Sequence, residues 1–256
     1  MKNLFRRIIT DMRLPAVSAL ILCLYVVCIL SLQIVPAISK STRKIPVYSV
    51  ETSEKKIAIT FDAAWGADKT REIMDICDQY GIKATFFLVG FWVEKYPELT
   101  AEITKRGFET GTHSQTHPNL PKLSVSEIEK ELTTSVNLIE QTASCKVKVF
   151  RPPFGDYDNK LIETAEKLNL TTIQWDVDTL DWKGLSAAEI LLRVEKNVRN
   201  GSIILCHNNS KHITDALPLI INSMQGRGYS FVTVSELIYT DNFYVDHTGR
   251  QHKNVA

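Results

Sequence analysis

From residue 55 onward, short apolar or β-branched runs alternate with longer amphipathic stretches. The short runs predict strands, because strands of a buried parallel sheet are apolar on both faces. The longer stretches repeat apolar residues at helical spacing and predict helices. The predicted strands are 57–61, 84–89, 108–112, 147–150, 171–175, 202–206 and 230–234. The predicted helices are 69–80, 96–106, 124–141, 159–168, 187–199 and 213–227.

Residues at several segment ends support these helix boundaries. Asp68 can cap the first helix, and Ser124 with Glu127 forms a capping box for the third. Gly81 and Gly107 follow the first two helices as stop signals. The alternation of seven strands with six helices predicts an α/β fold on a parallel sheet. The count fits a closed or nearly closed barrel one unit short of the usual eight, with an open doubly wound sheet as the alternative.

An apolar run of 22 residues, 14–35, precedes this pattern. Its length suffices for a helix across a bilayer core of about 30 Å. The cations before it are Lys2, Arg6, Arg7 and Arg13. Because positive charge stays in the cytoplasm, we expect 1–13 inside, 14–35 as a transmembrane signal-anchor, and the remainder outside at the cell membrane. The alternative is a cleaved signal peptide and a secreted protein, with a weak cleavage site at 37–39.

The other segment borders follow from the same patterns. Residues 36–53 lack periodicity and predict a stalk, 54–240 form the domain, and 241–256 predict a polar, poorly ordered tail. A net charge of +1 without a basic stripe argues against a nucleic-acid partner. The five cysteines include no CxxC motif, and an odd number lies outside the apolar run, so they predict no disulfide framework.

Polar side chains of chemical interest stand at or just after the ends of predicted strands. They are Asp62, His113, His117, Arg151, Asp178, Asp181, Trp182 and His207. An α/β barrel gathers strand-end residues into one site. Each residue also has an ordinary alternative: a strand-end aspartate can cap a helix, an arginine can form a structural pair, and a lone histidine can belong to the core.

Considered together, these residues form a hydrolytic set. Asp62 near Arg151 provides a carboxylate that stays ionised as a base, and His207 near Asp178 or Asp181 provides a charged acid. Such a set can hydrolyse an amide or an ester through a tetrahedral intermediate without a serine or cysteine nucleophile.

Two histidines add a candidate metal site. His113 and His117 are four residues apart, and Pro118 favours a loop over a continuing helix there. Cys206 adjoins His207, but neighbouring strand residues point to opposite faces, which disfavours a thiol nucleophile.

Five motifs resemble, in order, those of the polysaccharide deacetylases with a NodB-type homology domain, carbohydrate esterase family four. They are Thr60-Phe61-Asp62-Ala63, His113-Ser114-x-x-His117, Arg151-Pro152-Pro153-Phe154, Asp178-Thr179-x-Asp181-Trp182 and Leu205-x-His207. The resemblance covers about 55–237 and implies a distorted (β/α)7 barrel. Ala63 departs from it, because the family has a second aspartate there. The segment 63–66 looks like that of sporulation-associated and clostridial-type members.

The resemblance implies a role for each motif residue. Asp62 is the expected base and His207 the expected acid, with Arg151 fixing the former and Asp181 tuning the latter. The expected metal ligands are His113 and His117, which hold a divalent ion such as zinc or cobalt. The expected lining of the acetyl and sugar groove is Phe154, Trp182 and Asp178. Because Ala63 removes a ligand, we expect the metal to be held weakly.

The function expected from this resemblance is N-deacetylation of an extracellular glycan, with peptidoglycan amino sugars as substrate. Two alternatives remain open. Ala63 favours a catalytically silent relative that still binds glycan, and the chemistry also suits an esterase that removes O-acetyl groups from a polysaccharide.

Overall fold

The computed structural model describes residues 22–25 and 43–254. Its contacts divide the chain into two units, 1–42 and 43–256. In the first unit only residues 22–25 are described, and they are helical. The rest of the predicted membrane segment, 14–35, lies outside the described residues. Within the described ranges, no helix has both the length and the apolar character that a membrane span needs.

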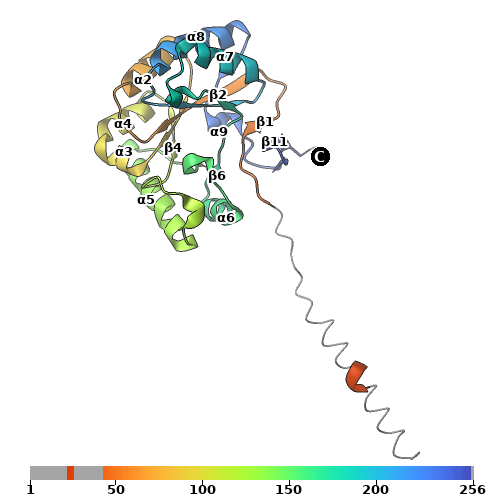
Figure 1. Ribbon diagram of the computed structural model, residues 1–256. Helices are drawn as coiled ribbons and strands as arrows, with labels where there is room; N and C mark the ends of the chain where they lie inside the picture. The colour runs from red at the N-terminus through yellow and green to blue at the C-terminus, as the bar shows by residue number, and fades with distance from the viewer. Residues whose placement is uncertain (1–21, 26–42, 255–256) are drawn as a thin grey trace, which may run out of the picture. The chain divides into compact units, whose positions relative to one another are not determined.

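The second unit is built on parallel strands around β2 (Lys56–Ala63). Its strand order is β6-β5-β4-β3-β2-β8-β7, and β9 pairs with the start of β2. The other strands are β3 (Thr85–Leu88), β4 (Glu109–Thr112), β5 (Val149–Phe150), β6 (Thr171–Thr172), β7 (Val177–Asp178), β8 (Ile203–His207) and β9 (Ser230–Phe231). Figure 1 shows these strands surrounded by helices.

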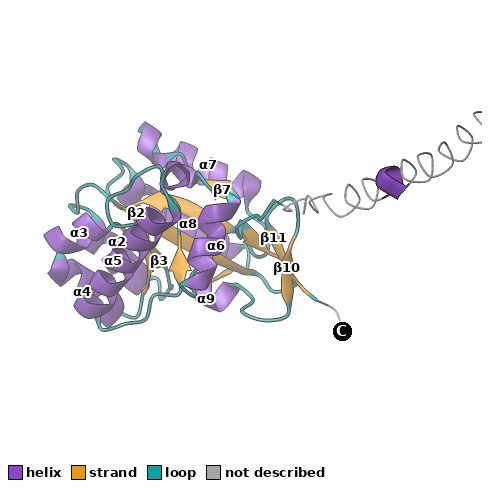
Figure 2. Ribbon diagram, turned by 90° about the horizontal axis from the view of Figure 1, so that it is seen from below, coloured by secondary structure: helices purple, strands orange, loops and turns teal. Residues whose placement is uncertain are grey.

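The helices cover the outside of this curved sheet (Figure 2). They are α2 (Thr70–Gln79), α3 (Gly90–Lys95), α4 (Pro97–Lys105), α5 (Val125–Ala143), α6 (Asn159–Lys167), α7 (Ala187–Asn197), α8 (Ile213–Gly226) and α9 (Val234–Leu237). Three short 3-10 turns are η1 (Leu120–Lys122), η2 (Pro153–Gly155) and η3 (Asp181–Lys183). The predicted α/β architecture with parallel strands is confirmed. Among the described strands no ladder joins β6 to β7, so the barrel is not closed by hydrogen bonds.

Successive side chains of β2 point alternately to the apolar core and to the opposite face of the sheet. Phe61 faces the apolar layer and stacks on Phe86 of β3, with ring centroids 5.1 Å apart. Thr60 and Asp62 instead contact Arg151 at the end of β5. Because all these strands run parallel, their carboxyl ends meet at one edge and carry the polar motifs together.

The helix boundary signals are mostly confirmed. The capping box of Ser124 and Glu127 is formed at α5, and Gly81 and Gly107 follow their helices with φ of +62° and +79°. The cap predicted at Asp68 is wrong, since α2 begins after Lys69 without a side-chain cap. The predicted strands and helices also missed β7, α3 and α9. These elements are too short to show periodicity.

A second, three-stranded sheet corrects the predictions for both ends of the domain. It contains β1 (Ser49–Val50), β10 (Phe243–Val245) and β11 (Arg250–Lys253), in the order β1-β11-β10. The irregular stalk is therefore wrong at Ser49–Val50, which form β1, and the poorly ordered tail is wrong for 243–253. Turn chemistry explains the hairpin, because the Asp246 carboxylate accepts hydrogen bonds from the backbone N–H groups of Thr248 and Arg250.

The cysteines of the described unit are free, as expected. Cys77 is buried in α2, where burial raises the pKa of its thiol to about 12. Cys206 is fully buried, and burial raises the pKa of its thiol well above its usual value. A thiol in that state is a poor nucleophile at neutral pH.

Candidate active site

A cavity of about 720 Å³ opens at the carboxyl ends of the strands. Its walls bring together Asp62, His113, His117, Asp178 and His207, which the chain separates by up to 145 positions. The size lies in the range of ligand-binding pockets. The strand-end motifs therefore converge on one site, as predicted.

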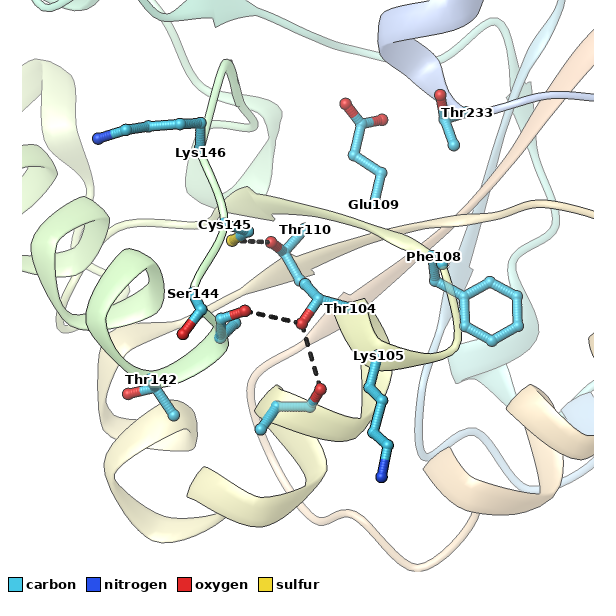
Figure 3. Close-up of a pocket in the computed structure, with 13 residues that line it drawn as sticks. Thr104, Lys105, Phe108, Glu109, Thr110, Thr142, Ser144, Cys145, Lys146 and Thr233 are labelled. Carbon is cyan, nitrogen blue, oxygen red and sulfur yellow. Dashed lines mark hydrogen bonds between the residues drawn. The ribbon is translucent and has the colours of Figure 1, made fainter.

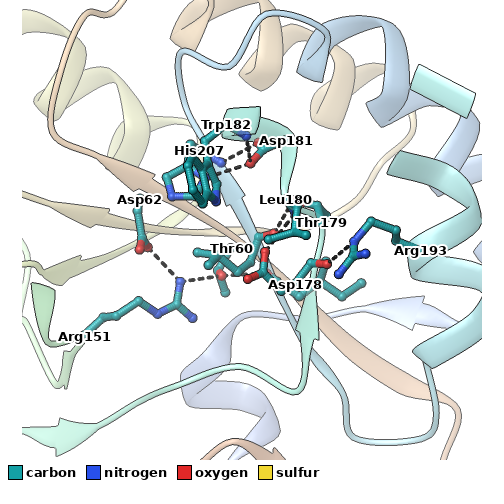
Figure 4. Close-up of polar contacts among 12 residues, drawn as sticks. Thr60, Asp62, Arg151, Asp178, Thr179, Leu180, Asp181, Trp182, Arg193 and His207 are labelled. Carbon is teal, nitrogen blue, oxygen red and sulfur yellow. Dashed lines mark hydrogen bonds and ion pairs between the residues drawn. The ribbon is translucent and has the colours of Figure 1, made fainter. Parts of the chain in front are cut away.

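Asp62 is a buried carboxylate held by a buried cation. The Nη1 group of Arg151 donates to Asp62 Oδ1 at 2.7 Å and to Thr60 Oγ1 at 2.7 Å (Figure 4). Its Nη2 group donates to the carbonyl of Gln174 at 3.1 Å. Burial pushes the pKa of Asp62 upward, but the charge of Arg151, with smaller contributions from His113 and His207, holds it below its usual value. Asp62 is thus an ionised proton acceptor.

His207 is oriented by Asp181, which lies in η3. Its Nδ1–H donates to Asp181 Oδ1 at 2.7 Å, and its backbone N–H donates to Asp181 Oδ2 at 2.8 Å. The carboxylate is fixed in turn by the backbone N–H of Trp182 at 2.9 Å. Burial lowers the pKa of His207, but the hydrogen bond and charge of Asp181 outweigh burial and raise it. Of the two aspartates considered as its partner, the structure selects Asp181.

His113 and His117 lie together on the opposite side of the cavity from His207. Their ring centroids are 4.9 Å apart. His113 Nδ1–H donates to the Arg151 carbonyl at 2.7 Å, which leaves Nε2 as the ring atom with a free lone pair. Burial, followed by the neighbouring His113, lowers the pKa of His117 to about 4. Both rings are therefore neutral at neutral pH, the state in which an imidazole can bind a metal ion.

The loop between these histidines is strained and anchored from α5. Ser114 and His117 have φ of +70° and +59°, a region that side chains other than glycine seldom adopt. The carboxylate of Glu131 accepts the backbone N–H groups of Gln115 and Thr116 at 3.0 and 2.8 Å. It also accepts the Thr116 hydroxyl at 2.7 Å. These contacts hold the strained loop in place.

The side chains that could bind a metal ion here form only part of a usual metal site. Two neutral imidazoles suit zinc or cobalt. A catalytic zinc normally has three protein ligands, and Ala63 occupies the position where the third was expected. Among the described residues, no group of three His, Cys, Asp or Glu side chains is arranged to hold a metal. Asp62 Oδ2 lies 3.6 Å from His113 Nε2.

The three residues predicted to contact substrate all line the cavity. Phe154 and Trp182 are 64% and 60% exposed, which leaves their rings free for a ligand. Asp178 is half-buried, and its Oδ1 accepts the backbone N–H of Leu180 at 2.8 Å. Neither aspartate of this motif caps α7, because Ser186 forms that capping box.

Several site residues were missed by sequence reasoning. The Arg151 guanidinium lies 4.1 Å from the ring centroid of Phe87 and 5.5 Å from that of Trp175, which together enclose the cation. Glu131 was missed because a glutamate within a long helix carries no distinguishing signal. Trp65 also lines the cavity, and its signal was the unusual segment 63–66.

A second cavity, of about 630 Å³, lies among α4, α5 and the start of β4 (Figure 3). Several of its polar groups are engaged in structural bonds. Thr110 contacts Cys145 at 3.2 Å, and Glu109 accepts the Thr85 hydroxyl at 2.7 Å. No histidine lines this cavity, so it lacks the chemistry of the first.

Comparisons with known proteins agree with this geometry. A peptidoglycan-N-acetylglucosamine deacetylase from Bacillus cereus is 34% identical over 197 residues, covering 75% of this chain and 72% of that protein. A peptidoglycan-N-acetylmuramic acid deacetylase from Bacillus subtilis is 35% identical over 189 residues, covering 74% of this chain and 40% of that protein. The chain also spans 65% of a further Bacillus subtilis protein of 32% identity, so it is shorter than these relatives.

Solved structures include a carbohydrate esterase family 4 pseudoenzyme from Bacillus anthracis. It superposes with a TM-score of 0.73 at 31% identity, over 82% of this chain and 73% of that chain. A variant of that pseudoenzyme with restored enzymatic activity has the same TM-score at 35% identity, over 75% of this chain and 70% of that one. Residues 49–173 match the polysaccharide deacetylase family directly. With its motifs gathered in one cavity and a relative of 34% identity matched over 72% of that relative's length, the chain belongs to the polysaccharide deacetylase family.

Proposed function

We propose that this protein removes N-acetyl groups from amino sugars of peptidoglycan. The observation that carries the proposal is the arrangement of Asp62 and His207. They stand on adjacent strands and line one cavity. Despite burial, Arg151 holds the pKa of Asp62 below its usual value and Asp181 holds the pKa of His207 above its usual value. An ionised base beside a protonated acid is the arrangement that amide hydrolysis through a tetrahedral intermediate requires.

In the proposed reaction, the Asp62 carboxylate takes a proton from a water molecule as the water oxygen attacks the acetyl carbonyl carbon. The tetrahedral intermediate then collapses as His207 donates its Nε2 proton to the sugar nitrogen and the carbon–nitrogen bond breaks. Acetate and a free amino sugar are released. Arg151 stays charged and keeps Asp62 in place, while Asp181 stabilises the imidazolium of His207.

We further propose that His113 and His117 hold a divalent metal, zinc or cobalt, with weaker affinity than a three-ligand site. Such an ion polarises a carbonyl oxygen when bound. The proposal is supported by the two free, neutral imidazoles and by the family to which the chain belongs. The remaining coordination positions fall to water or substrate.

The peptidoglycan substrate is inferred from two relatives, a peptidoglycan-N-acetylglucosamine deacetylase and a peptidoglycan-N-acetylmuramic acid deacetylase. We also propose that the domain is tethered outside the cytoplasmic membrane by 14–35, on the basis of the sequence alone. Protease added to intact protoplasts should remove the domain, whereas a protected domain would reject the tethering.

A second candidate is glycan binding without catalysis. It is favoured by Ala63, which leaves the donor set incomplete, and by the structural likeness to a pseudoenzyme. The two candidates differ in one measurement, the release of acetate.

The test uses the full chain purified in detergent, incubated with peptidoglycan, with added zinc or cobalt, and with an O-acetylated polysaccharide in parallel. The proposal expects acetate and new free amines from peptidoglycan, and neither from the Asp62→Asn variant. Binding of glycan without acetate release would instead support the second candidate. Release from the O-acetylated polymer alone would identify an esterase.

A further inference from the structure

Trp65 stands exposed at the edge of the cavity, although it is a large apolar side chain. Its exposed fraction is 64%, equal to that of Phe154 and close to that of Trp182. All three line the same cavity. Exposed aromatic side chains gathered around one pocket indicate a binding surface, because leaving large apolar groups in contact with water does not stabilise the fold.

The backbone that presents Trp65 is held firmly. The next residue, Gly66, has φ of +69°, and its carbonyl accepts Trp92 Nε1–H at 2.7 Å and Asn208 Nδ2–H at 3.0 Å. A Cβ at Gly66 would lie 2.3 Å from the side-chain amide of Asn209, and the positive φ would strain any other residue at this position. The indole is therefore presented by a fixed turn.

The rings also divide between two sides of the cavity. Trp65 and Phe154 each contact the ring of His117 edge-on, at centroid distances of 4.9 and 4.6 Å. Trp182 lies on the other side, next to Asp181 and His207. Aromatic side chains thus lie beside His117 on one side of the cavity and near His207 on the other.

We propose that Trp65 is a stacking platform for a second sugar ring of the glycan, next to the ring that loses its acetyl group. The apolar C–H face of a pyranose covers an aromatic ring while its hydroxyls stay in water, as amphipathic aromatics favour. A cavity of about 720 Å³ lies in the range for drug-sized ligands, which exceed a single amino sugar. Trp65 therefore makes the site selective for chains over monosaccharides. This inference rests on the proposed function, from which it takes the glycan ligand and the place of its deacetylated ring.

The test measures binding, so that it does not depend on turnover. Full chain carrying Asp62→Asn is titrated in detergent by calorimetry with N-acetylglucosamine, its disaccharide and its tetrasaccharide. Adding Trp65→Ala should weaken tetrasaccharide binding about tenfold and leave monosaccharide binding within about twofold, the scale of one lost aromatic contact. Trp65→Phe should restore most of the affinity. Leu192→Ala is the matched control, since Leu192 on α7 is also 64% exposed but does not line the cavity.

Equal tetrasaccharide affinity in the Trp65→Ala and parent proteins would overturn the proposal. So would a parent protein that binds none of the three sugars, or a Trp65→Ala variant that weakens the monosaccharide as much as the tetrasaccharide. Acetate release from peptidoglycan by wild type, measured separately, would leave the proposed function standing in each of these cases. The failure of one inference is therefore distinguishable from the failure of the other.

Discussion

Asp62 and His207 are register partners on the adjacent parallel strands β2 and β8. Directly paired residues of neighbouring strands point to the same face, so the carboxylate and the imidazole reach the cavity side by side. Their partners come from elsewhere in the fold, Arg151 after β5 and Asp181 in η3. The sheet therefore sets the spacing of base and acid, and the flanking loops set their charge.

The first prediction concerns this pair. Asp62→Asn and His207→Ala should each lower acetate release by at least ~100-fold, the usual scale for a lost acid–base group. Asparagine keeps the shape of Asp62 and can still accept from Arg151, so the fold should survive. Melting temperatures within a few degrees of wild type should accompany the loss. Near-normal activity in either folded variant would reject the assignment.

A second prediction concerns pH. The acid must be protonated, so kcat should fall as pH rises through the pKa of His207, which Asp181 holds above its ordinary value. Asp181→Asn removes the charge that raises this pKa while burial still lowers it. The alkaline limb of the kcat profile should therefore move to lower pH. If the alkaline limb of the kcat profile does not move in Asp181→Asn, a group other than His207 determines its position.

The third prediction concerns Ala63, which is fully buried. Ala63→Asp introduces a carboxylate that is costly to bury unless a cation neutralises it. We expect a lower melting temperature than wild type without metal and a larger rise when zinc is added. Calorimetric titration should show tighter binding as well. Ala63→Asn, which is similar in size but neutral, is the control. If Ala63→Asp binds zinc no better than Ala63→Asn, another group completes the metal site.

Glu131 gives a fourth prediction. Glu131→Ala removes three hydrogen bonds to the loop of His113 and His117 and should cost about 1–3 kcal/mol of unfolding free energy. Zinc affinity should fall too, because the loop with positive φ at His117 loses its anchor. Glu129→Ala changes an exposed glutamate of the same helix and should alter neither quantity. Unchanged zinc affinity in Glu131→Ala would exclude the anchoring role.

The C-terminal sheet provides a fifth prediction. His252 bonds to Glu51 through Nδ1 and to Asp246 through Nε2 at 2.8 Å, and these bonds raise its pKa. A raised pKa contributes stability that is complete below about pH 6.5 and is lost as pH rises through the folded-state value. The melting temperature of His252→Asn should therefore trail wild type more at pH 6 than at pH 9.

Elements with many periodic residues could be predicted from the sequence. Residues 124–141 predicted the helix α5, which runs over Val125–Ala143, and each of the seven predicted strands is present at least in part. The polar motifs also converge as expected, because parallel strands end at one edge. Two of the shorter elements, β7 and α3, were not predicted, since no periodicity develops over their lengths of two and six residues.

The site was less predictable than the fold. The partner of His207 stayed undecided between Asp178 and Asp181, because they are only three positions apart and the turn at η3 decides which one faces the imidazole. Glu131 lies within the helix α5. Nothing in the sequence indicates that this helix packs beside the loop of His113 and His117, so its contacts with that loop could not be predicted. The tail forms strands because β11 pairs with β1, which lies about 200 residues earlier in the sequence. A pattern of neighbouring residues cannot indicate such a distant pairing.

That pairing has a consequence for how the protein is made. Ser49 pairs with Arg250, so the first strand of the domain gains this partner only after residue 250 has been synthesised. Val50 also bonds with Gly201, which ties the same strand to the loop before β8. The domain therefore cannot finish folding while 243–253 are still in the ribosome. Any truncation that removes 243–253 leaves β1 without a partner on that side.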